Sequence, residues 1–116
     1  MSNQSAAEAF DAAFDALGHP MRRRMLELLR DGARPVNQIA AELPIGRPAV
    51  SKHLKVLEGA GLVEHRSHWT RNLYAVAPAG LAPLQRWLTE TWDDTLGAFA
   101  AYVEQHENTD ASEEKP

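Results

Sequence analysis

One stretch of eighteen residues, GRPAVSKHLKVLEGAGLV at positions 46–63, constrains the fold of this chain more than any other. With a helical period, Val50, Leu54 and Leu57 form one apolar stripe. Gly61 suits the left-handed position that follows a helix C-terminus, and strand-forming residues come after it. Another face carries three cations and a hydroxyl but no acid, from Arg47, Ser51, Lys52 and Lys55. The stretch therefore predicts a helix that packs on a core with one side and presents positive charge with the other.

The charge of the chain is unevenly distributed, although its net value of −4 argues at first sight against a polyanionic partner. Residues 22–71 hold ten Lys/Arg and five Asp/Glu, a local balance of +5. The remaining residues hold two basic and eleven acidic side chains, a balance of −9. A basic centre between acidic ends indicates a polyanion-binding segment flanked by parts with other roles.

Composition limits the class of protein. The 116 residues, 44% hydrophobic and 24% charged, suffice for one globular domain with a single core. The sequence has neither an apolar run long enough to span a membrane nor a signal-peptide pattern, so we expect a cytoplasmic protein. The absence of cysteine excludes disulfides, thiolate metal sites and cysteine catalysis.

A first helix is predicted near the N-terminus. Ser5 and Glu8 have the spacing of a capping box, and Gly18 ends the pattern. Phe10 and Phe14 fall on one face of this helix. An exposed helix with two Phe on one side needs a partner surface, either elsewhere in the chain or in another subunit.

Two further helices lead into the basic stretch. One begins at Pro20 and runs to about Arg30, and the next is capped by Asn37. The arginine run at 22–24 is either a solvated helix face or a set of phosphate contacts. The segment 44–46, Pro-Ile-Gly, forms a short turn before the basic helix, which is typical of a helix-turn-helix motif.

The segment LVEHRSHWTRNLYAV at 62–76 predicts two short strands around a polar turn, a wing. Residues 67–71 form the predicted tip, flanked by Arg66 and Arg71. Trp69 lies in this tip. Because tryptophans are mostly buried, we expect its side chain to fold back on the domain rather than to contact DNA or a partner.

A long last helix begins between Pro78 and Pro83 and runs to about Gln105. Its apolar stripe is larger than one small core can cover, so we expect it to form a dimer together with the first helix. The predicted interface consists of Phe10, Phe14, Leu84, Leu88, Trp92, Leu96 and Phe99. The domain is expected to span residues 6–105, between a disordered N-terminus at 1–5 and an acidic disordered tail at 106–116.

The segments RPAVSKHLKVLEGAGLVEHR and RNLYAVAPAGLAPLQRWL resemble the ArsR/SmtB family of bacterial winged-helix repressors, with the likeness covering about residues 10–105. The RWL…W…L continuation looks like the branch of SdpR-type autorepressors. The resemblance implies a mainly α fold with a small β-hairpin (α+β), a winged helix-turn-helix of order α-α-α-α-β-β-α that is homodimeric through its first and last helices. It also implies a repressor that occupies an imperfect dyad operator and is released by an unidentified ligand or partner.

The metal sites of that family are missing from this sequence. The founding members use a Cys-Val-Cys pair in the third helix, and the matching positions here are Pro35 and Asn37, which do not bind soft metals. Another family site needs Asp-x-His and His-x-x-Glu on the last helix. Here Asp93 and Asp94 are followed by no histidine at that spacing, and His106 stands alone. We therefore expect no metal and no cofactor.

The remaining histidines do not suggest catalysis. His65 and His68 lie three apart on a predicted strand and turn, which does not place them on one face, so we expect solvated side chains. Ser51 and His53 diverge by about 200° on a helix, too far for a nucleophile and its base. His19 precedes Pro20 and is expected to cap or pack. The chain is therefore not expected to be an enzyme.

Two classes of function remain after this. A winged helix used as a protein-interaction module would lose its basic residues, whereas this chain keeps them, so a DNA-binding regulator is favoured. A ligand-sensing repressor with a non-thiolate metal or small-molecule site stays open as a variant. The predicted base contacts are Arg47, Pro48, Ser51 and Lys52, and the predicted backbone contacts are His53, Lys55, Arg66 and Arg71.

Overall fold

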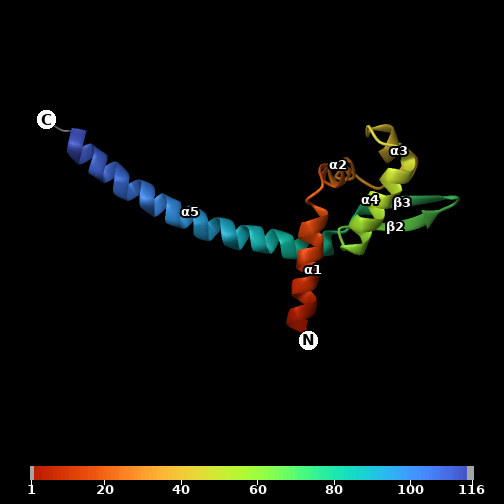
Figure 1. Ribbon diagram of the computed structural model, residues 1–116, viewed down its shortest axis with the longest axis horizontal. Helices are drawn as coiled ribbons and strands as arrows, with labels where there is room; N and C mark the ends of the chain where they lie inside the picture. Colours follow the sequence, from red (N-terminus) through yellow and green to blue (C-terminus); the bar gives the residue numbers. More distant parts are fainter. Residues whose placement is uncertain (1, 115–116) are drawn as a thin grey trace. The chain divides into compact units, whose positions relative to one another are not determined.

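The computed structural model describes residues 2–114, with side-chain exposure described for residues 6–107. Within this part the chain forms five helices and three strands (Figure 1). The helices are α1 (Ser2–Ala16), α2 (Pro20–Leu28), α3 (Val36–Ala41), α4 (Arg47–Gly59) and α5 (Pro78–Glu114), and the strands are β1 (Arg34–Pro35), β2 (Val63–His68) and β3 (Arg71–Val76). The chain divides into two compact units, Met1–Leu84 and Gln85–Pro116. The first unit has the predicted winged helix-turn-helix.

The core of the first unit is built around the apolar stripe of α4. Val50, Leu54 and Leu57 are completely buried, as the helical period predicts. Met25 of α2 and Ile39 of α3 are equally buried in the same cluster. Burial of each such side chain stabilises the fold by about 1.5–3 kcal/mol, so this cluster fixes the orientation of α4 and hence of its opposite, basic face.

The turn into α4 has the predicted chemistry. Gly46 is the N-cap residue with extended backbone, and Pro48 lies in the first turn, where its missing N–H costs nothing. The cap of α3 differs from the prediction. Pro35 occupies the N-cap position and Asn37 lies inside the helix, because residue 35 is held in extended conformation by pairing with Leu73.

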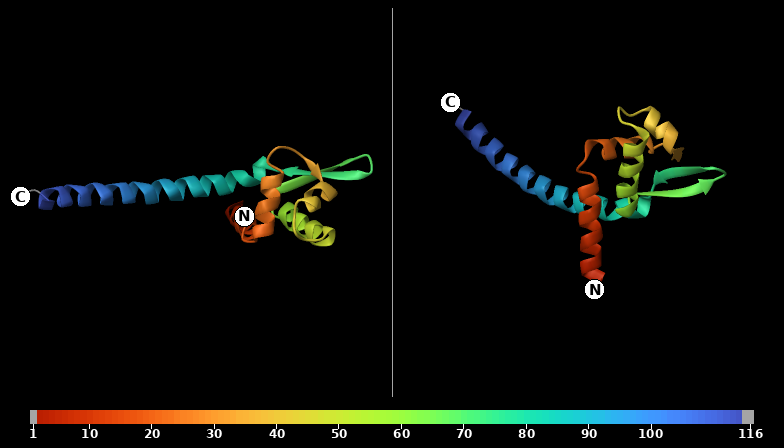
Figure 2. Two further views of the ribbon diagram at one scale, coloured as in Figure 1. Left: turned by 90° about the horizontal axis from the view of Figure 1, so that it is seen from above. Right: turned by 45° about the vertical axis from the view of Figure 1, so that its right-hand side comes forward.

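The sheet has three antiparallel strands in the order β1-β3-β2. The hairpin of β2 and β3 is the predicted wing, and both views of Figure 2 show it projecting away from the helices of the first unit. Strand β1 was not predicted. It pairs Arg34 and Pro35 with Tyr74 and Leu73, and two residues are too few to show the alternation that marks a strand in sequence.

Two glycines meet where α4 ends and α5 begins. Gly61 has φ +80°, which confirms the left-handed position predicted for it. A Cβ added to Gly80 would lie 1.5 Å from the carbonyl oxygen of Gly61, so no larger residue fits there. The N–H of Ala77 donates to the carbonyl of Leu62 at 2.9 Å and fastens the same junction. Sequence reasoning found Gly61 but not Gly80.

Two helix boundaries differ from the prediction. Helix α1 begins at Ser2 rather than after Ser5, and α5 continues to Glu114 rather than to about Gln105. Serine, asparagine, threonine and aspartate make up most of these extensions, and their modest helix propensity explains why local sequence did not predict the continuation. Met1, Lys115 and Pro116 lie outside the described residues, as do the side chains of residues 2–5 and 108–114.

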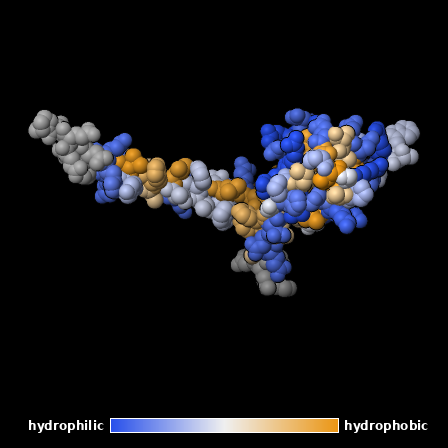
Figure 3. All heavy atoms as spheres, turned by 45° about the horizontal axis from the view of Figure 1, so that its top comes forward, coloured by the Kyte–Doolittle hydropathy of each residue, from blue (hydrophilic) through white to orange (hydrophobic). Residues whose placement is uncertain are grey.

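The second unit consists of α5 beyond Leu84. Apolar side chains lie open along this helix, as the orange atoms of Figure 3 show. Trp92 is 62% exposed and Phe99 is 61% exposed, and Leu88 and Leu96 are about half exposed. Leu84 differs from the prediction, because it is buried in the core of the first unit and offers no surface to a partner. Across the described residues, no helix is both long and apolar enough to cross a membrane.

Candidate nucleic-acid interface

The basic face of α4 is open to solvent along its length. Arg47, Pro48, Lys52 and Lys55 are exposed, and Ser51 is half-buried between them. None of these side chains has an acidic neighbour on the same face before Glu58, in the last turn of the helix. Because the apolar stripe is completely buried on the other side, α4 can present this face without losing any core contact.

A hollow lies between the N-terminal end of α4 and the wing. It encloses about 290 Å³ and is lined by residues of α3, α4 and the hairpin, among them Asn37, Arg47, Thr70, Arg71 and Asn72. Arg47 and Arg71 are 24 positions apart in sequence, and each was predicted separately as a DNA contact. In the structure both arginines line this one hollow, and the residues that line it include no carboxylate. A phosphate oxygen is the kind of group that such a pair binds well.

The register of the hairpin places the two wing arginines on one face. Arg71 lies opposite His68, and Arg66 lies opposite Leu73. Paired residues share a face and alternate residues return to it, so Arg66, His68 and Arg71 lie together. Glu64 falls on the same face at the base of the hairpin, away from the tip. The outer part of the wing therefore carries cations without acids.

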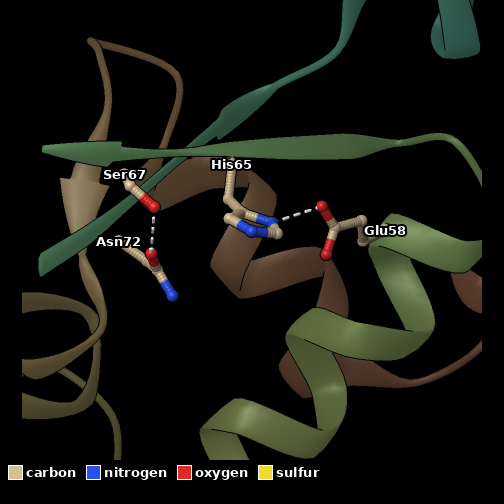
Figure 4. A network of polar contacts seen from close by, with 4 residues as sticks. All are labelled: Glu58, His65, Ser67 and Asn72. Atoms are coloured by element: carbon tan, nitrogen blue, oxygen red, sulfur yellow. Dashed lines mark hydrogen bonds and ion pairs between the residues drawn. The ribbon is translucent and has the colours of Figure 1, made fainter.

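Contacts on the other face stiffen the hairpin and tie it to α4 (Figure 4). Nδ1 of His65 lies 2.5 Å from Oε2 of Glu58, and the Ser67 hydroxyl donates to Oδ1 of Asn72 at 3.2 Å. The ring of His65 also lies against Tyr74, with centroids 5.2 Å apart. Burial raises the pKa of Tyr74, and the nearby Glu58 carboxylate raises it further. His65 is exposed, as predicted for a solvated wing histidine, but the α4–β2 packing also places a carboxylate beside it, which was not predicted.

The arginine run of α2 has a structural role that was neither of the two interpretations offered by the sequence, a solvated face or phosphate contacts. Nε of Arg22 donates to the carbonyl of Ala16, and Nη1 of Arg23 donates to the carbonyl of Leu17, both at 2.6 Å. These carbonyls belong to the C-terminal end of α1, where cations are favoured. Two of the three arginines therefore cap a neighbouring helix.

Arg22 also takes part in a cluster of basic groups beside α4. Its Nη1 lies 3.4 Å from Nδ1 of His53, and the rings of His19 and His53 lie 4.5 Å apart. Burial lowers the pKa of His53, and the neighbouring His19 and Arg22 lower it further. His19 is also the N-cap of α2, where Nδ1 accepts from the N–H of Met21 at 3.1 Å, as its position before Pro20 suggested. A phosphate brought to this cluster would meet only positive or neutral partners.

Trp69 is the clearest departure from the sequence prediction. The tip of the wing is only the pair Trp69-Thr70, because the strands extend to His68 and Arg71. Trp69 is 90% exposed and does not fold back on the domain. The turn directs its side chain outward at the far end of the hairpin, beyond the reach of the core.

The described residues contain no group of three or more His, Asp or Glu side chains that could hold a metal ion. His65 is engaged with Glu58. His106 stacks on Tyr102 with ring centroids 3.7 Å apart, and its Nδ1 lies 2.8 Å from the Tyr102 carbonyl oxygen. Apart from the neighbouring pair His19 and His53, the histidines of the described part lie in separate local contacts.

Comparison with known proteins agrees with this geometry. A helix-turn-helix domain family matches residues 17–66. The HTH-type transcriptional regulator Rv2034 of Mycobacterium tuberculosis is 42% identical over 94 residues, which cover 81% of this chain and 88% of that protein. The transcriptional repressor SdpR of Bacillus subtilis is 37% identical over 54 residues, 46% of this chain and 60% of that protein.

Solved structures show the same fold. One is the solution structure of a homodimeric winged helix-turn-helix DNA-binding domain from Mycobacterium bovis, described as a possible ArsR-family transcriptional regulator. It superposes with a TM-score of 0.66 at 29% identity and covers 81% of this chain and 87% of that one.

Proposed function

This chain belongs to the ArsR/SmtB family of winged helix-turn-helix transcriptional regulators, and from that premise we propose that it is a dimeric repressor whose two α4 helices read an operator of imperfect dyad symmetry. The proposal makes it a DNA-binding protein of the cytoplasm and not an enzyme. The observation that carries it is the hollow that Arg47 and Arg71 both line, since this arrangement suits an anion that touches the recognition helix and the wing at once.

Base readout is assigned to the N-terminal half of α4. Arg47 lies in the first turn and can reach the O6 and N7 acceptors of a guanine, the commonest specific contact in a major groove. Ser51 and Lys52 lie one turn further along, where they can reach neighbouring base edges. Pro48 offers only apolar contact, which suits a thymine methyl group.

Phosphate contacts are assigned to groups around that centre. Lys55 is exposed on α4, and His53 sits beside Arg22 and His19 in the basic cluster. Arg66 and Arg71 share the outer face of the wing. Contacts of this type fix the register of the protein on the duplex and supply the salt-dependent part of the affinity.

Dimerisation is assigned to the apolar side chains of α1 and α5. Phe14 is about half exposed, and Leu88, Trp92, Leu96 and Phe99 stay open along the second unit. Side chains of this size are depleted on the surface of a monomer and enriched in contacts between subunits. A two-fold axis would then place two α4 helices about 34–36 Å apart, in successive major grooves.

Selection of bound duplexes from a random pool tests the proposal. The expected result is enrichment of a sequence with two inverted half-sites whose centres lie about 10–10.5 base pairs apart. Sedimentation of the protein alone and with the selected duplex gives the stoichiometry, and two chains per duplex are expected. A pool without enrichment, or one monomer bound tightly to a single half-site, would contradict it.

A further inference from the structure

The turn of the wing holds a large apolar residue in a backbone conformation that favours glycine. Trp69 has φ +61° and is the one non-glycine residue with positive φ among those that the structure describes. His68 and Arg71 are paired, so Trp69-Thr70 is a two-residue hairpin loop with positive φ at its first position alone. This is the pattern of a type II′ turn, in which glycine is preferred at that position.

Nothing within the domain accounts for a tryptophan there. A β-carbon in the left-handed region is strained, and 90% exposure leaves most of the indole in water. The ring contact described for it is the neighbouring His68, edge-on at 6.3 Å. Both the backbone and the hydrophobic effect therefore disfavour Trp69 in the free protein, which points to a contact made only in a complex.

The charges around the wing tip indicate which kind of molecule Trp69 would contact. Residues 65–73 contain Arg66, Arg71 and two histidines but no acid, and Arg71 lines the hollow that also holds Arg47. A surface of this charge fits a polyanion, and its continuity with the proposed DNA face of α4 fits duplex DNA in particular.

The length of the wing sets where the tip would lie. Each strand of the hairpin has six residues, which span about 17–20 Å at the rise of a β-strand. The major groove is about 12 Å wide. With α4 in that groove, a hairpin of this length would be long enough to reach past the bordering sugar–phosphate backbone to the adjacent minor groove.

We propose that Trp69 enters the minor groove beside each half-site and packs its indole against the deoxyribose walls, an inference that rests on the proposed function. Apolar side chains placed in a minor groove act as wedges, and the indole N–H can donate to the acceptors on its floor. The contact is largely independent of sequence and would lengthen the footprint of each protomer without adding a charge.

The test compares Trp69→Gly, Trp69→Asn and Trp69→Phe with the wild-type protein on the duplex selected from the random pool. Glycine and asparagine tolerate positive φ, so the thermal midpoint of both variants should equal that of the wild type or exceed it by up to about 5 °C. Their affinity for the duplex should nevertheless fall about ten-fold, the loss expected when an aromatic contact is removed. Trp69→Phe should retain most of the affinity.

Two further readouts separate this contact from the charged ones. The salt dependence of binding should keep its slope in Trp69→Gly, whereas Arg71→Ala should reduce the slope by about one. Hydroxyl-radical cleavage reports on the exposure of the sugars, and protection should be lost at the flanks of the half-sites alone.

The outcomes are distinguishable. Wild-type binding with undiminished affinity in Trp69→Gly would overturn the inference and leave the proposed function standing. A fall of stability and affinity together in the Gly and Asn variants would also overturn it, since it would mean that the indole supports the fold. A wild-type protein that binds no duplex from the pool would overturn the proposed function and this inference with it.

Discussion

Glu58 in the last turn of α4 and His65 on β2 form a hydrogen bond, with Oε2 and Nδ1 2.5 Å apart (Figure 4). The pair joins the recognition helix to the wing at the end of α4 that lies away from Arg47. It helps to hold the hairpin at a fixed angle to the helix. That angle matters, because Arg47 and Arg71 line one hollow only while helix and wing keep their relative position.

Loss of the Glu58 charge should therefore affect DNA binding through geometry. Both side chains are about one-third exposed, so Glu58→Gln should lower the free energy of unfolding by only about 0.3–1 kcal/mol. Affinity for the selected duplex should fall about two- to five-fold with unchanged base preference, since no base contact is removed. Titration with the selected duplex and with single-base variants measures both quantities.

Glu64→Gln is the matched control, because it removes one negative charge from the same strand as His65. It should bind the duplex at least as well as the wild type. Equal losses in the two variants would mean that net charge, and not the Glu58–His65 pair, governs the effect.

Gly80→Ala should destabilise the fold, because its Cβ would lie 1.5 Å from the carbonyl oxygen of Gly61. Either α5 or the end of α4 must shift, and overpacking of this kind costs about 1–3 kcal/mol or more. Gly59→Ala is the control in α4, where an added Cβ meets nothing within 4 Å. That variant should be neutral or stabilised by up to about 1 kcal/mol. Denaturant unfolding of both proteins checks the difference, and equal stabilities would contradict the close packing.

The apolar stripe of α4 and the contact between Gly61 and Gly80 show which features a sequence pattern can predict and which it cannot. The buried stripe of Val50, Leu54 and Leu57 was predictable, because the helical spacing of apolar and polar residues can be recognised within one segment of sequence. The approach of Gly80 to Gly61 was not, since it depends on how two elements meet, and a glycine in a helix carries no local sign of its neighbour. Of these two glycines, only Gly61 was predicted, from the preference for glycine in the left-handed position after a helix C-terminus.

The candidate interface likewise has some features that were predictable from the sequence and others that were not. The exposed cations on α4 and the wing were predictable from the sequence pattern. That Arg47 and Arg71 line one hollow was not, because it depends on the strand register and on how the wing packs against the helices. Trp69 was predicted wrongly because average burial was applied to a residue whose position is set by a two-residue turn. The contact between Glu58 and His65 was missed, because His65 was considered only as a possible partner of His68 and not of a residue on another element.

Acidic pH should destabilise the protein through His53. Its pKa in the folded protein is lowered from 6.5 by burial and by His19 and Arg22, so the unfolded chain binds the proton more readily. This contribution to stability is fully present above about pH 6.5 and is lost as the pH falls from there through the lower, folded-state pKa. His53→Gln keeps a hydrogen-bond acceptor for Arg22 but does not titrate. Its free energy of unfolding should depend less on pH between 7 and 5, and an unchanged profile would contradict the prediction.

Alanine substitution of Arg47 and of Lys55 should impair DNA binding in different ways. Arg47→Ala should cost about 1–3 kcal/mol and relax the sequence preference at one position, because a bidentate base contact is lost. Lys55→Ala should weaken all duplexes alike and reduce the salt slope by about one, as expected for a phosphate contact. Binding to the selected duplex and its single-base variants at several salt concentrations measures the contrast. Identical, sequence-blind losses would contradict the assignment.

A negative charge on the apolar face of α5 should dissociate the dimer. Leu96 is about half exposed beside Trp92 and Phe99, which are exposed by 62% and 61%. Leu96→Glu would bury an unpaired carboxylate in the proposed contact, and the energetic cost of that exceeds the loss of the leucine itself. Sedimentation should show a monomer. Affinity for the two-site duplex should fall sharply, although the recognition helix α4 itself is unchanged in this variant.

Ala101→Glu is the matched control for this variant. Ala101 is exposed on the same helix and lies about 180° around it from Trp92 and about 140° from Leu96, so the same charge is placed on the face opposite the proposed contact. That protein should remain dimeric and bind the duplex as the wild type does, apart from a small loss from the added negative charge. Because each half-site supplies part of the affinity, a monomeric Leu96→Glu protein with undiminished binding would show that one protomer suffices, and the dimeric repressor would have to be abandoned.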